Sequence, residues 1–295
     1  MAVLLAGQAE LGHGIAFLWQ TSGDKRLMEW HCLEPPALQE QHMRMIRDFP
    51  LLVFVLSLVV LWLSAQIGVF CRNRSRPLEE VERTDLATVL TATLTLLGLI
   101  IAFSFSMAVS RYDQRKNYET EEANAIGTER VRAALLPAAH TERVRELLRQ
   151  YLHQRVLFYE SRDERQLEEI DKDTAALEVE LWSTVQAAAA AQPNPVMALV
   201  AQGMNDVLNT RGYTQAAWWN RIPRAAWCLM VAIAIFCNLL IGYGAHRKGI
   251  ILFLVLPLAL STSFFLISDI DSPRGGVIRV RPQNLESLAQ SLNGQ

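Results

Sequence analysis

Residues 86–110 read LATVLTATLTLLGLIIAFSFSMAVS, and residues 111–132 continue as RYDQRKNYETEEANAIGTERVR. An apolar run of this length can cross the hydrocarbon core of a bilayer, which is about 30 Å thick. Neither stretch contains proline, the residue that most strongly interrupts a helix. We therefore expect one long helix that crosses the membrane and then continues into water as a charged rod.

The sides of this expected helix differ in the size of their side chains. Small residues recur at intervals of four along one side: Gly98, Ala102, Ser106 and Ser110. A bulky row lies beside them and consists of Leu97, Ile101 and Phe105. A membrane helix with a small side can pack tightly against other helices. It can instead contribute to the wall of a pore, with Ile101 and Phe105 as an apolar constriction.

Three further apolar segments are long enough to span a bilayer: residues 49–71, 225–243 and 250–268. Together with residues 86–110, they predict an all-α integral membrane protein with four transmembrane helices. The first two spans are expected to form an antiparallel hairpin. Thr84 and Asp85 are expected to cap the second span, because short polar side chains satisfy the free N–H groups at a helix start.

The remaining segments define the expected domains. Residues 111–223 are polar, with apolar positions at helical spacing, and predict a helical domain inserted between spans two and three. The two transmembrane hairpins occupy residues 45–110 and 224–268, and residues 269–295 form a turn and a tail. Residues 1–44 lack the basic segment of a signal peptide, so we interpret them as a weakly ordered extension or a misassigned start.

The apolar positions of residues 111–223 also indicate which side chains form the core of that domain. One helix within residues 141–159 is expected to bury Val144, Leu147, Leu148, Tyr151, Leu152 and Leu157. A second begins near Arg162 and is stopped by Pro193 and Pro195. A third begins near Val196 and is expected to bury Leu199, Val200, Met204, Val207 and Leu208.

Basic residues near the spans predict the orientation of the protein. Four spans place the N-terminus, the 111–223 domain and the C-terminus on one side of the membrane. Eleven Lys and Arg residues lie close to the membrane on that side, against six on the other. Because the more basic side is normally cytoplasmic, we expect the helical domain to be cytoplasmic.

Composition and motifs exclude several classes of function. The net charge is -2, so the chain is not a strongly basic nucleic-acid binder, and no nucleic-acid partner is expected. The sequence contains no HExxH, GxSxG, P-loop or GxGxxG motif, and we expect neither an enzyme nor a cofactor. The four cysteines form no CxxC pair and are expected to be buried thiols that pack as small hydrophobic side chains, not a disulfide or metal framework: Cys32, Cys71, Cys228 and Cys237.

Charged residues gather where the expected helix leaves the membrane: Arg111, Asp113, Arg115 and Lys116. They can anchor the helix among lipid headgroups, with Asp113 paired to Lys116 on the next turn. Alternatively, the cations can concentrate anions at the mouth of a pore. Three acidic pairs in polar stretches are interpreted as solvated surface: Glu79–Glu80, Glu121–Glu122 and Glu168–Glu169.

Two carboxylates, Asp269 and Asp271, directly follow the last span within the stretch SDIDSPRGG at residues 268–276. Carboxylates two positions apart beside a turn can supply oxygen ligands to a hard cation such as Ca²⁺. The same pattern is also a common way to stabilise a turn through side-chain hydrogen bonds to the backbone. The sequence leaves both interpretations open.

Two segments carry a resemblance to a known family. They are LLGLIIAFSFSMAVSRYDQRKNYETEEANAIGTERVRAALLP at residues 96–137 and LISDIDSPRGGVIRV at residues 266–280. Taken together, they resemble the bacterial bestrophin-like domain family over roughly residues 46–285. The combination A-x-S-R-Y-D-x-R, E-E-A-N-A-I-G-T and D-I-D-x-P-x-x-G is the specific part of this resemblance. It implies a bacterial protein of the cytoplasmic membrane.

A more distant similarity links that family to bestrophins, which are pentameric anion channels with four spans per subunit. The resemblance implies a pentamer whose second span lines the pore, with an apolar neck of residues four apart. Leu97, Ile101 and Phe105 have that spacing, and so do Leu99, Phe103 and Met107. Calcium-regulated bestrophins carry a longer acidic cluster after the last span than the Asp269 and Asp271 present here.

These observations favour a homo-oligomeric ion channel in a lipid bilayer, passing small ions and more readily anions. The expected neck and pore residues are Leu97, Gly98, Ile101, Ala102, Phe105 and Ser106. An alternative is a non-conducting membrane adaptor or sensor that recruits a cytoplasmic partner through residues 111–223. The two hypotheses differ in what they require of the second span: a channel needs one face at a central axis, whereas an adaptor needs only packing within the subunit.

Overall fold

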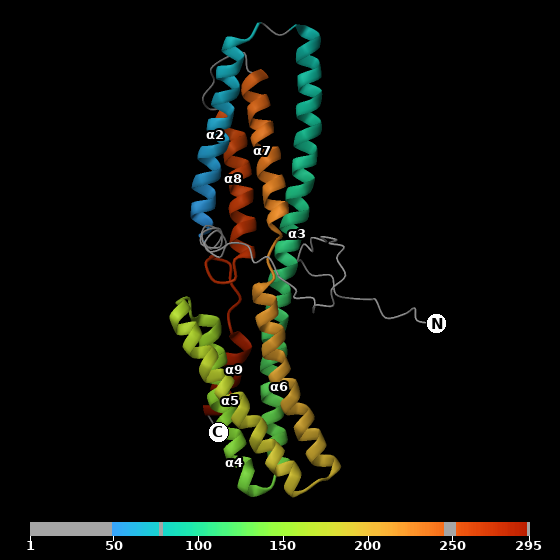
Figure 1. Cartoon of the computed structure of the whole chain (residues 1–295), viewed down its shortest axis with the longest axis vertical. Helices are drawn as coiled ribbons and strands as arrows, with labels where there is room; N and C mark the ends of the chain where they lie inside the picture. The colour runs from blue at the N-terminus through green and yellow to red at the C-terminus, as the bar shows by residue number, and fades with distance from the viewer. Residues whose placement is uncertain (1–48, 77–78, 245–251, 294–295) are drawn as a thin grey trace, which may run out of the picture.

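The computed structural model describes residues 49–76, 79–244 and 252–293, and every regular element in these ranges is helical (Figure 1). The helices are α2 (Pro50–Arg74), α3 (Glu80–Arg132), the short 3₁₀ turn η1 (Ala133–Leu135), α4 (Ala138–Glu160), α5 (Glu164–Ala191), α6 (Pro195–Trp219), α7 (Arg224–Gly244), α8 (Leu252–Asp271) and α9 (Gln283–Asn293). The all-helical prediction is therefore confirmed for the described residues. The expectations for residues 1–44 and for Cys32 lie outside the described ranges. Of the other cysteines, Cys237 is buried as expected, whereas the prediction is wrong for Cys71 and Cys228, which lie on exposed sides of α2 and α7.

Four helices are long and apolar enough to cross a membrane, as predicted. The predicted spans fall within α2, α3, α7 and α8. Helix α3 continues for 53 residues, from Glu80 to Arg132. At a rise of about 1.5 Å per residue it is roughly 80 Å long, well over twice the thickness of a bilayer core. The prediction of one helix that runs from the apolar into the charged segment is confirmed.

The start of α3 lies earlier than predicted. The helix begins at Glu80, with Glu79 as its N-cap, and Glu79 and Glu82 form a reciprocal capping box. In this arrangement each side chain accepts a hydrogen bond from the other residue's backbone N–H. Thr84 and Asp85, the predicted caps, lie inside the helix. A pair of glutamates three residues apart was therefore a better signal of the helix start than the Thr-Asp dipeptide.

The four apolar helices do not pair in sequence order. Helix α2 packs mainly against α7 and α8, whereas α3 packs against α7 and α8 and hardly touches α2. In Figure 1, α7 stands between the blue α2 and the green α3. The expected hairpin of spans one and two is therefore wrong as a packing unit, although the two helices run antiparallel.

Glycines explain why α2 pairs with α7. A Cβ atom added at Gly242 of α7 would clash with the backbone carbonyl of Ala65. One added at Gly68 of α2 would clash with the carbonyl oxygen of Leu239. Small residues at a membrane helix interface allow such a close approach of backbones, and van der Waals contact then stabilises the pair. The small-residue packing predicted for α3 occurs instead between α2 and α7.

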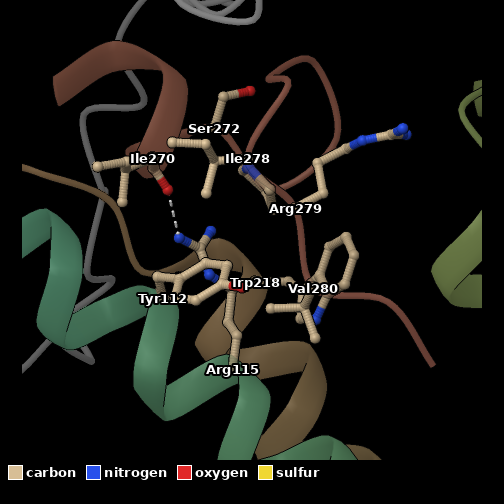
Figure 2. A pocket seen from close by; sticks show the side chains of 9 residues that line it. Tyr112, Arg115, Trp218, Ile270, Ser272, Ile278, Arg279 and Val280 are labelled. Carbon is tan, nitrogen blue, oxygen red and sulfur yellow. Dashed lines mark hydrogen bonds between the residues drawn. The ribbon is translucent and has the colours of Figure 1, made fainter. Parts of the chain in front are cut away.

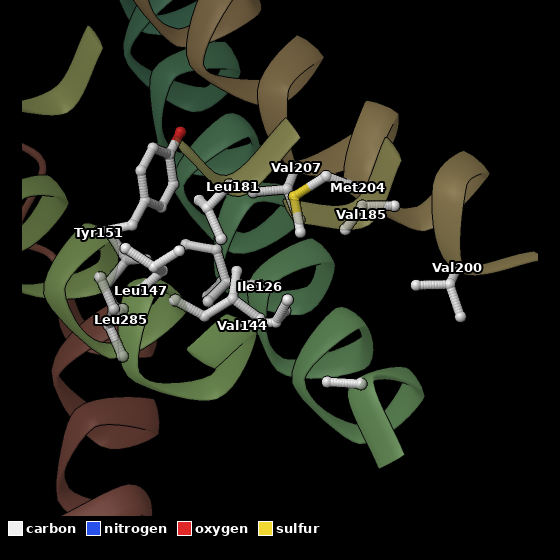
Figure 3. Packing of buried hydrophobic residues seen from close by; sticks show 14 of the residues in the cluster. Ile126, Val144, Leu147, Tyr151, Leu181, Val185, Val200, Met204, Val207 and Leu285 are labelled. Carbon is white, nitrogen blue, oxygen red and sulfur yellow. The ribbon is translucent and has the colours of Figure 1, made fainter. Parts of the chain in front are cut away.

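The polar part of the chain forms a second bundle from the C-terminal half of α3 together with α4, α5, α6 and α9 (Figure 1). Its core contains Ile126 of α3, Tyr151 of α4, Leu181 of α5, Met204 of α6 and Leu285 of α9, all at most 1% exposed (Figure 3). The predicted helices are present, and most of the predicted inner positions are buried. Leu199 is an exception, because its side chain is 46% exposed near the start of α6.

The close approach at Gly242 gives a direct test of the fold. We expect Gly242→Ala to lower the free energy of unfolding by about 2 kcal/mol, because the new Cβ forces the two backbones apart. Gly212→Ala is the matched control, since a Cβ at Gly212 meets nothing within 4 Å and alanine favours a helix. Thermal unfolding in detergent measures both, and an equal midpoint for the two variants would contradict the packing.

Candidate functional site

The candidate site is the side of α3 that faces away from the rest of the subunit. Leu97, a predicted pore residue, is 1% exposed and lies in the core shared with α2, α7 and α8. Ile101 is half-buried against the same core. The other four predicted pore residues are exposed: Gly98, Ala102, Phe105 and Ser106. A Cβ at Gly98 would meet nothing within 4 Å, so no other described helix packs against the side of α3 that carries this residue.

The structure distinguishes the two apolar rows that have the same spacing. Leu99, Phe103 and Met107 are 51%, 62% and 39% exposed, and none belongs to a buried cluster. At about 100° per residue, Leu99 and Phe103 lie on the side of the helix opposite Leu97. The row formed by Leu99, Phe103 and Met107 therefore points outward from the subunit, while the Leu97 row begins inside it.

The outward side changes from apolar to polar along the helix. Exposed residues at intervals of three or four continue from the apolar row, and we call them the outer stripe: Ala102, Ser106, Ser110, Asp113, Asn117, Glu121 and Asn124. A shallow open groove runs along part of it and is lined by Ser106, Ser110, Asp113 and Asn117 among others. The stripe is small or polar from Ala102 to Asn124, which is unusual for a helix side that starts at membrane depth.

Arg115, one of the predicted mouth residues, points into the protein instead of toward this stripe. Its side chain is 1% exposed, and its guanidinium donates to the backbone carbonyls of Ile270 at 2.8 Å and Asp271 at 3.3 Å (Figure 2). These carbonyls end α8, where the helix dipole favours a positive charge. Burial lowers the pKa of Arg115 to about 10, so the group remains charged at pH 7. Arg115 therefore acts as a C-terminal cap for α8.

The two aspartates at the end of α8 are also occupied by backbone donors. The carboxylate of Asp271 accepts from the N–H of Ile222 at 3.1 Å and pairs with Arg111 at 3.6 Å. Asp269 accepts from the N–H groups of Val277 at 2.7 Å and Ile278 at 2.9 Å. The carboxylates thus close the turn after α8 and fasten the start of α7 to it.

This geometry fits the turn interpretation of the SDIDSPRGG motif. Asp269 and Asp271 are both at most 3% exposed and direct their oxygens toward different backbone segments. Within the described ranges, no group of three or more His, Cys, Asp or Glu side chains could hold a metal ion. Ca²⁺ takes about six to eight oxygen ligands, and these two carboxylates, aimed at separate backbone segments, do not begin such a shell together. The arrangement therefore lacks the features of a calcium site.

The four predicted mouth residues separate into two groups. Arg111 and Arg115 are drawn into the contact with α8, while Asp113 and Lys116 are exposed. No ion pair joins Asp113 to Lys116, although both lie in the described part of α3. The free charge at this level of α3 is therefore one carboxylate on the outer stripe and one lysine at its edge.

Arg274 is a residue of this junction to which the sequence assigned no role. Its guanidinium stacks 4.3 Å from the ring centre of Trp218 and 4.6 Å from that of Phe158. It also donates to the carbonyls of Phe158 and Ser161, both at 2.8 Å, and so caps the end of α4. Burial lowers the pKa of Arg274 to about 10. Its place in the D-I-D-x-P-x-x-G motif was the one signal that could have found it.

The comparisons with known proteins agree with this geometry. A profile of the bestrophin-like domain family matches residues 51–285, which include α3 and the whole turn after α8. The chain belongs to the bestrophin-like family. No curated protein matches the sequence.

Solved structures of a bacterial bestrophin homologue from Klebsiella pneumoniae share the fold of this bestrophin-like protein. One, phased by Zn-SAD, has a TM-score of 0.57 at 13% sequence identity and covers 82% of this chain and 98% of its own. Another, of a point mutant of the homologue, has a TM-score of 0.58 at 13% identity and covers 82% and 99%. At this identity the likeness establishes the fold alone.

The polar bundle of the bestrophin-like protein is held to α3 by a buried carboxylate. Glu122 is fully buried, in contrast to the solvated surface predicted for Glu121–Glu122. It forms an ion pair with Arg155 and accepts from Tyr159 at 3.3 Å and Thr214 at 3.4 Å. Of the two glutamates, Glu121 is exposed on the outer stripe. Glu121 therefore lies on the outer side of α3, and Glu122 lies on its inner side.

The contact between Arg115 and α8 can be tested by substitution. We expect Arg115→Met to lower the free energy of unfolding by about 3 kcal/mol, because it leaves two buried helix-end carbonyls, those of Ile270 and Asp271, without their charged donor. Lys116→Met, at the exposed neighbouring position, serves as the control and should change stability little. Thermal unfolding in detergent compares the two, and a small effect of Arg115→Met would contradict the capping role.

Proposed function

We propose that this bestrophin-like protein is a homo-oligomeric ion channel in which the outer stripe of α3 faces a central pore. The observation that carries the proposal is the continuity of that stripe from Ala102 to Asn124 on a single uninterrupted helix. Polar side chains at membrane depth are stable only against protein or water, because lipid offers them no hydrogen bonds. A water-filled pore supplies that environment to Ser106 and Ser110 within the predicted span, and the same side of the helix continues beyond the span with polar residues from Asp113 to Asn124.

A ring of subunits follows from the same geometry. One α3 presents a single stripe and encloses nothing, so several copies must surround an axis to form a closed pathway. A pentamer is the number implied by the family resemblance. We propose that the protein assembles in this way within the bacterial cytoplasmic membrane, with the polar bundle on the cytoplasmic side. The distribution of basic residues near the spans supports this orientation.

The exposed apolar row supplies the neck of the proposed pore. Leu99, Phe103 and Met107 lie beside the first residues of the stripe, Ala102 and Ser106, and project away from the subunit core. A ring of such side chains can close a narrow pore by excluding water. Of the residues first expected there, Ala102 and Ser106 lie on the same side, and Gly98 and Phe105 lie at its edge. Leu97 packs inside the subunit and would support the neck from behind.

The charges that remain on the outer stripe favour cations. The anion preference expected from the sequence came from the distant resemblance to anion channels and from the cations Arg111, Arg115 and Lys116. Of these cations, Arg111 and Arg115 are used in the contact with α8. The exposed charges on the stripe are those of Asp113 and Glu121, and Lys116 lies at its edge. Rings of carboxylates in a pore raise the local concentration of cations. We therefore propose that small cations pass more readily than anions.

The selectivity can be measured in planar bilayers with the purified full-length protein. Under a KCl gradient, we expect the wild-type reversal potential to lie toward the K⁺ equilibrium potential. Asp113→Asn should lower the ratio of cation to anion permeability by about threefold or more, because each subunit loses one carboxylate from the pore. Glu168→Gln, which neutralises an exposed carboxylate on α5, is the matched control and should leave the ratio unchanged.

The oligomeric mass in detergent separates the channel from the adaptor hypothesis. A ring-shaped oligomer that conducts, with selectivity sensitive to Asp113, supports the channel. A monomer, or a ring that passes no current, contradicts it and favours a membrane adaptor that recruits a partner through residues 111–223. A conducting ring whose selectivity ignores Asp113 would keep the channel but remove the outer stripe from its pore.

A further inference from the structure

Glu129 is a buried carboxyl group that lacks the partners of its neighbours on α3. It lies near the end of this helix, its side chain is fully buried, and neither of its oxygen atoms has a hydrogen-bond partner. By contrast, Glu119 and Glu122, on the same side of α3, each accept several hydrogen bonds. Buried polar groups are normally satisfied, so this exception calls for a physical explanation.

The carboxyl group is pressed against the backbone of α6. A Cβ atom added at Gly203 would clash with Oε2 of Glu129 and with the guanidinium of Arg132. The absence of a side chain at Gly203 is thus what admits the glutamate into the contact between α3 and α6. The neighbouring positions on α6, Val200, Met204 and Val207, are aliphatic or thioether side chains in the bundle core.

Two charged groups face Glu129. On α3, Arg132 lies 3.9 Å away with 27% of its side chain exposed, too distant for a hydrogen bond. On α6, Asp206 contributes a second negative charge. The η1 turn brings no titratable group, since it consists of Ala133, Ala134 and Leu135. The residues of α4 in the same core are Val144, Leu147, Leu148, Tyr151, Leu152, Phe158 and Tyr159. Of these, the two tyrosines are titratable, and their hydroxyl groups face other carboxylates: Tyr151 donates to Glu178 at 3.5 Å, and Tyr159 donates to Glu122 at 3.3 Å.

These surroundings favour the neutral form of the carboxyl group. Burial raises the pKa of Glu129 to about 8, Arg132 lowers it in part, and Asp206 raises it further. An ionised carboxylate in a site without hydrogen bonds is far more costly to bury than the neutral acid. Near neutral pH, the group therefore holds its proton, and it releases the proton to solvent as the pH rises through this range.

We propose that Glu129 is a proton-operated switch in the contact between α3 and α6. In its neutral form, the carboxylic acid of Glu129 packs against Gly203 without intervening water. When it loses its proton, the carboxylate draws the partly exposed Arg132 and water into the contact, which loosens the end of α3 from α6. Because α3 is one helix from Glu80 to Arg132, a change at Glu129 acts on the same element that carries the outer stripe.

Proton linkage fixes the sign of the expected effect. The folded protein binds the Glu129 proton more tightly than the unfolded chain, whose glutamates titrate near 4.5. The stability contributed by this proton is therefore complete at acid pH and declines between about pH 4.5 and 8. Wild-type stability should fall over this range relative to a variant that cannot ionise at position 129.

The test compares the thermal midpoints of the full-length wild type and Glu129→Gln in detergent from pH 5 to 9. We expect the midpoint of the wild type to fall by about 5 °C more than that of Glu129→Gln. Glu168→Gln, an exposed carboxylate replaced in the same way, should follow the wild type. Infrared spectra should show the C=O band of a protonated carboxylic acid at pH 6 that is lost at pH 9 and is missing from Glu129→Gln.

Hydrogen exchange locates the change. After correction for the intrinsic pH dependence, amides of α6 around Gly203 should exchange faster at pH 9 than at pH 6 in the wild type and equally in Glu129→Gln. Parallel midpoint curves, or no acid band assigned to Glu129, would overturn the proposal. If Glu129→Gln does not fold, Glu129→Leu replaces it. None of these measurements uses ion flux, so their outcome is independent of the channel proposal.

Discussion

The inner side of α3 holds the molecule together through three buried charges and one buried acid that is neutral near pH 7. Four groups on this side, spaced one or two turns apart, each meet a different part of the chain. Arg115 caps α8, and Glu119 accepts from the first backbone N–H groups of α9 at 2.8 and 3.0 Å. Glu122 binds Arg155 of α4, and Glu129 lies against α6. Without these contacts, a helix of this length would not stay fixed to its neighbours. The contacts therefore determine the position of α3 in the molecule.

This division of α3 explains why its two sides carry such different chemistry. Burying an ion without a partner costs far more free energy than a partnered contact returns. Each inner charge therefore constrains both its own position and that of the element it contacts. The outer stripe has no such partners within the described part of the subunit. Whether a residue on this side is small, polar or apolar therefore depends on what it faces outside the subunit. A helix fixed on one side from Arg115 to Glu129 can present the other side in a constant orientation. Residues that line a pore would need such a constant orientation.

The sequence was sufficient for the features that depend on local pattern. Apolar length predicts the four membrane helices, and the lack of proline between residues 86 and 132 predicts the continuity of α3. It could not predict which side of α3 is buried, because the rows of Leu97 and Leu99 have the same spacing. The sequence also led us to place Arg111 and Arg115 at the open mouth of a pore. Their partners lie about 155 residues away in the chain, and no local rule connects Arg115 with the carbonyl of Ile270.

The misplaced arginines have a consequence for how selectivity can be inferred in such proteins. A cluster of cations at a membrane boundary indicates anion attraction only if the cations reach the aqueous path. Here Arg115 is held by the carbonyl dipoles at the end of α8, and Arg111 is paired with Asp271, so both arginines contribute little field to the solvent. Asp113, two residues before Arg115, is left exposed on the opposite side of the same helix turn. The cluster carries a net charge of +2, but its two exposed members, Asp113 and Lys116, sum to zero, and the one that lies on the outer stripe is negative. The buried contact that fixes α3 therefore also determines which charges the outer side of the helix presents.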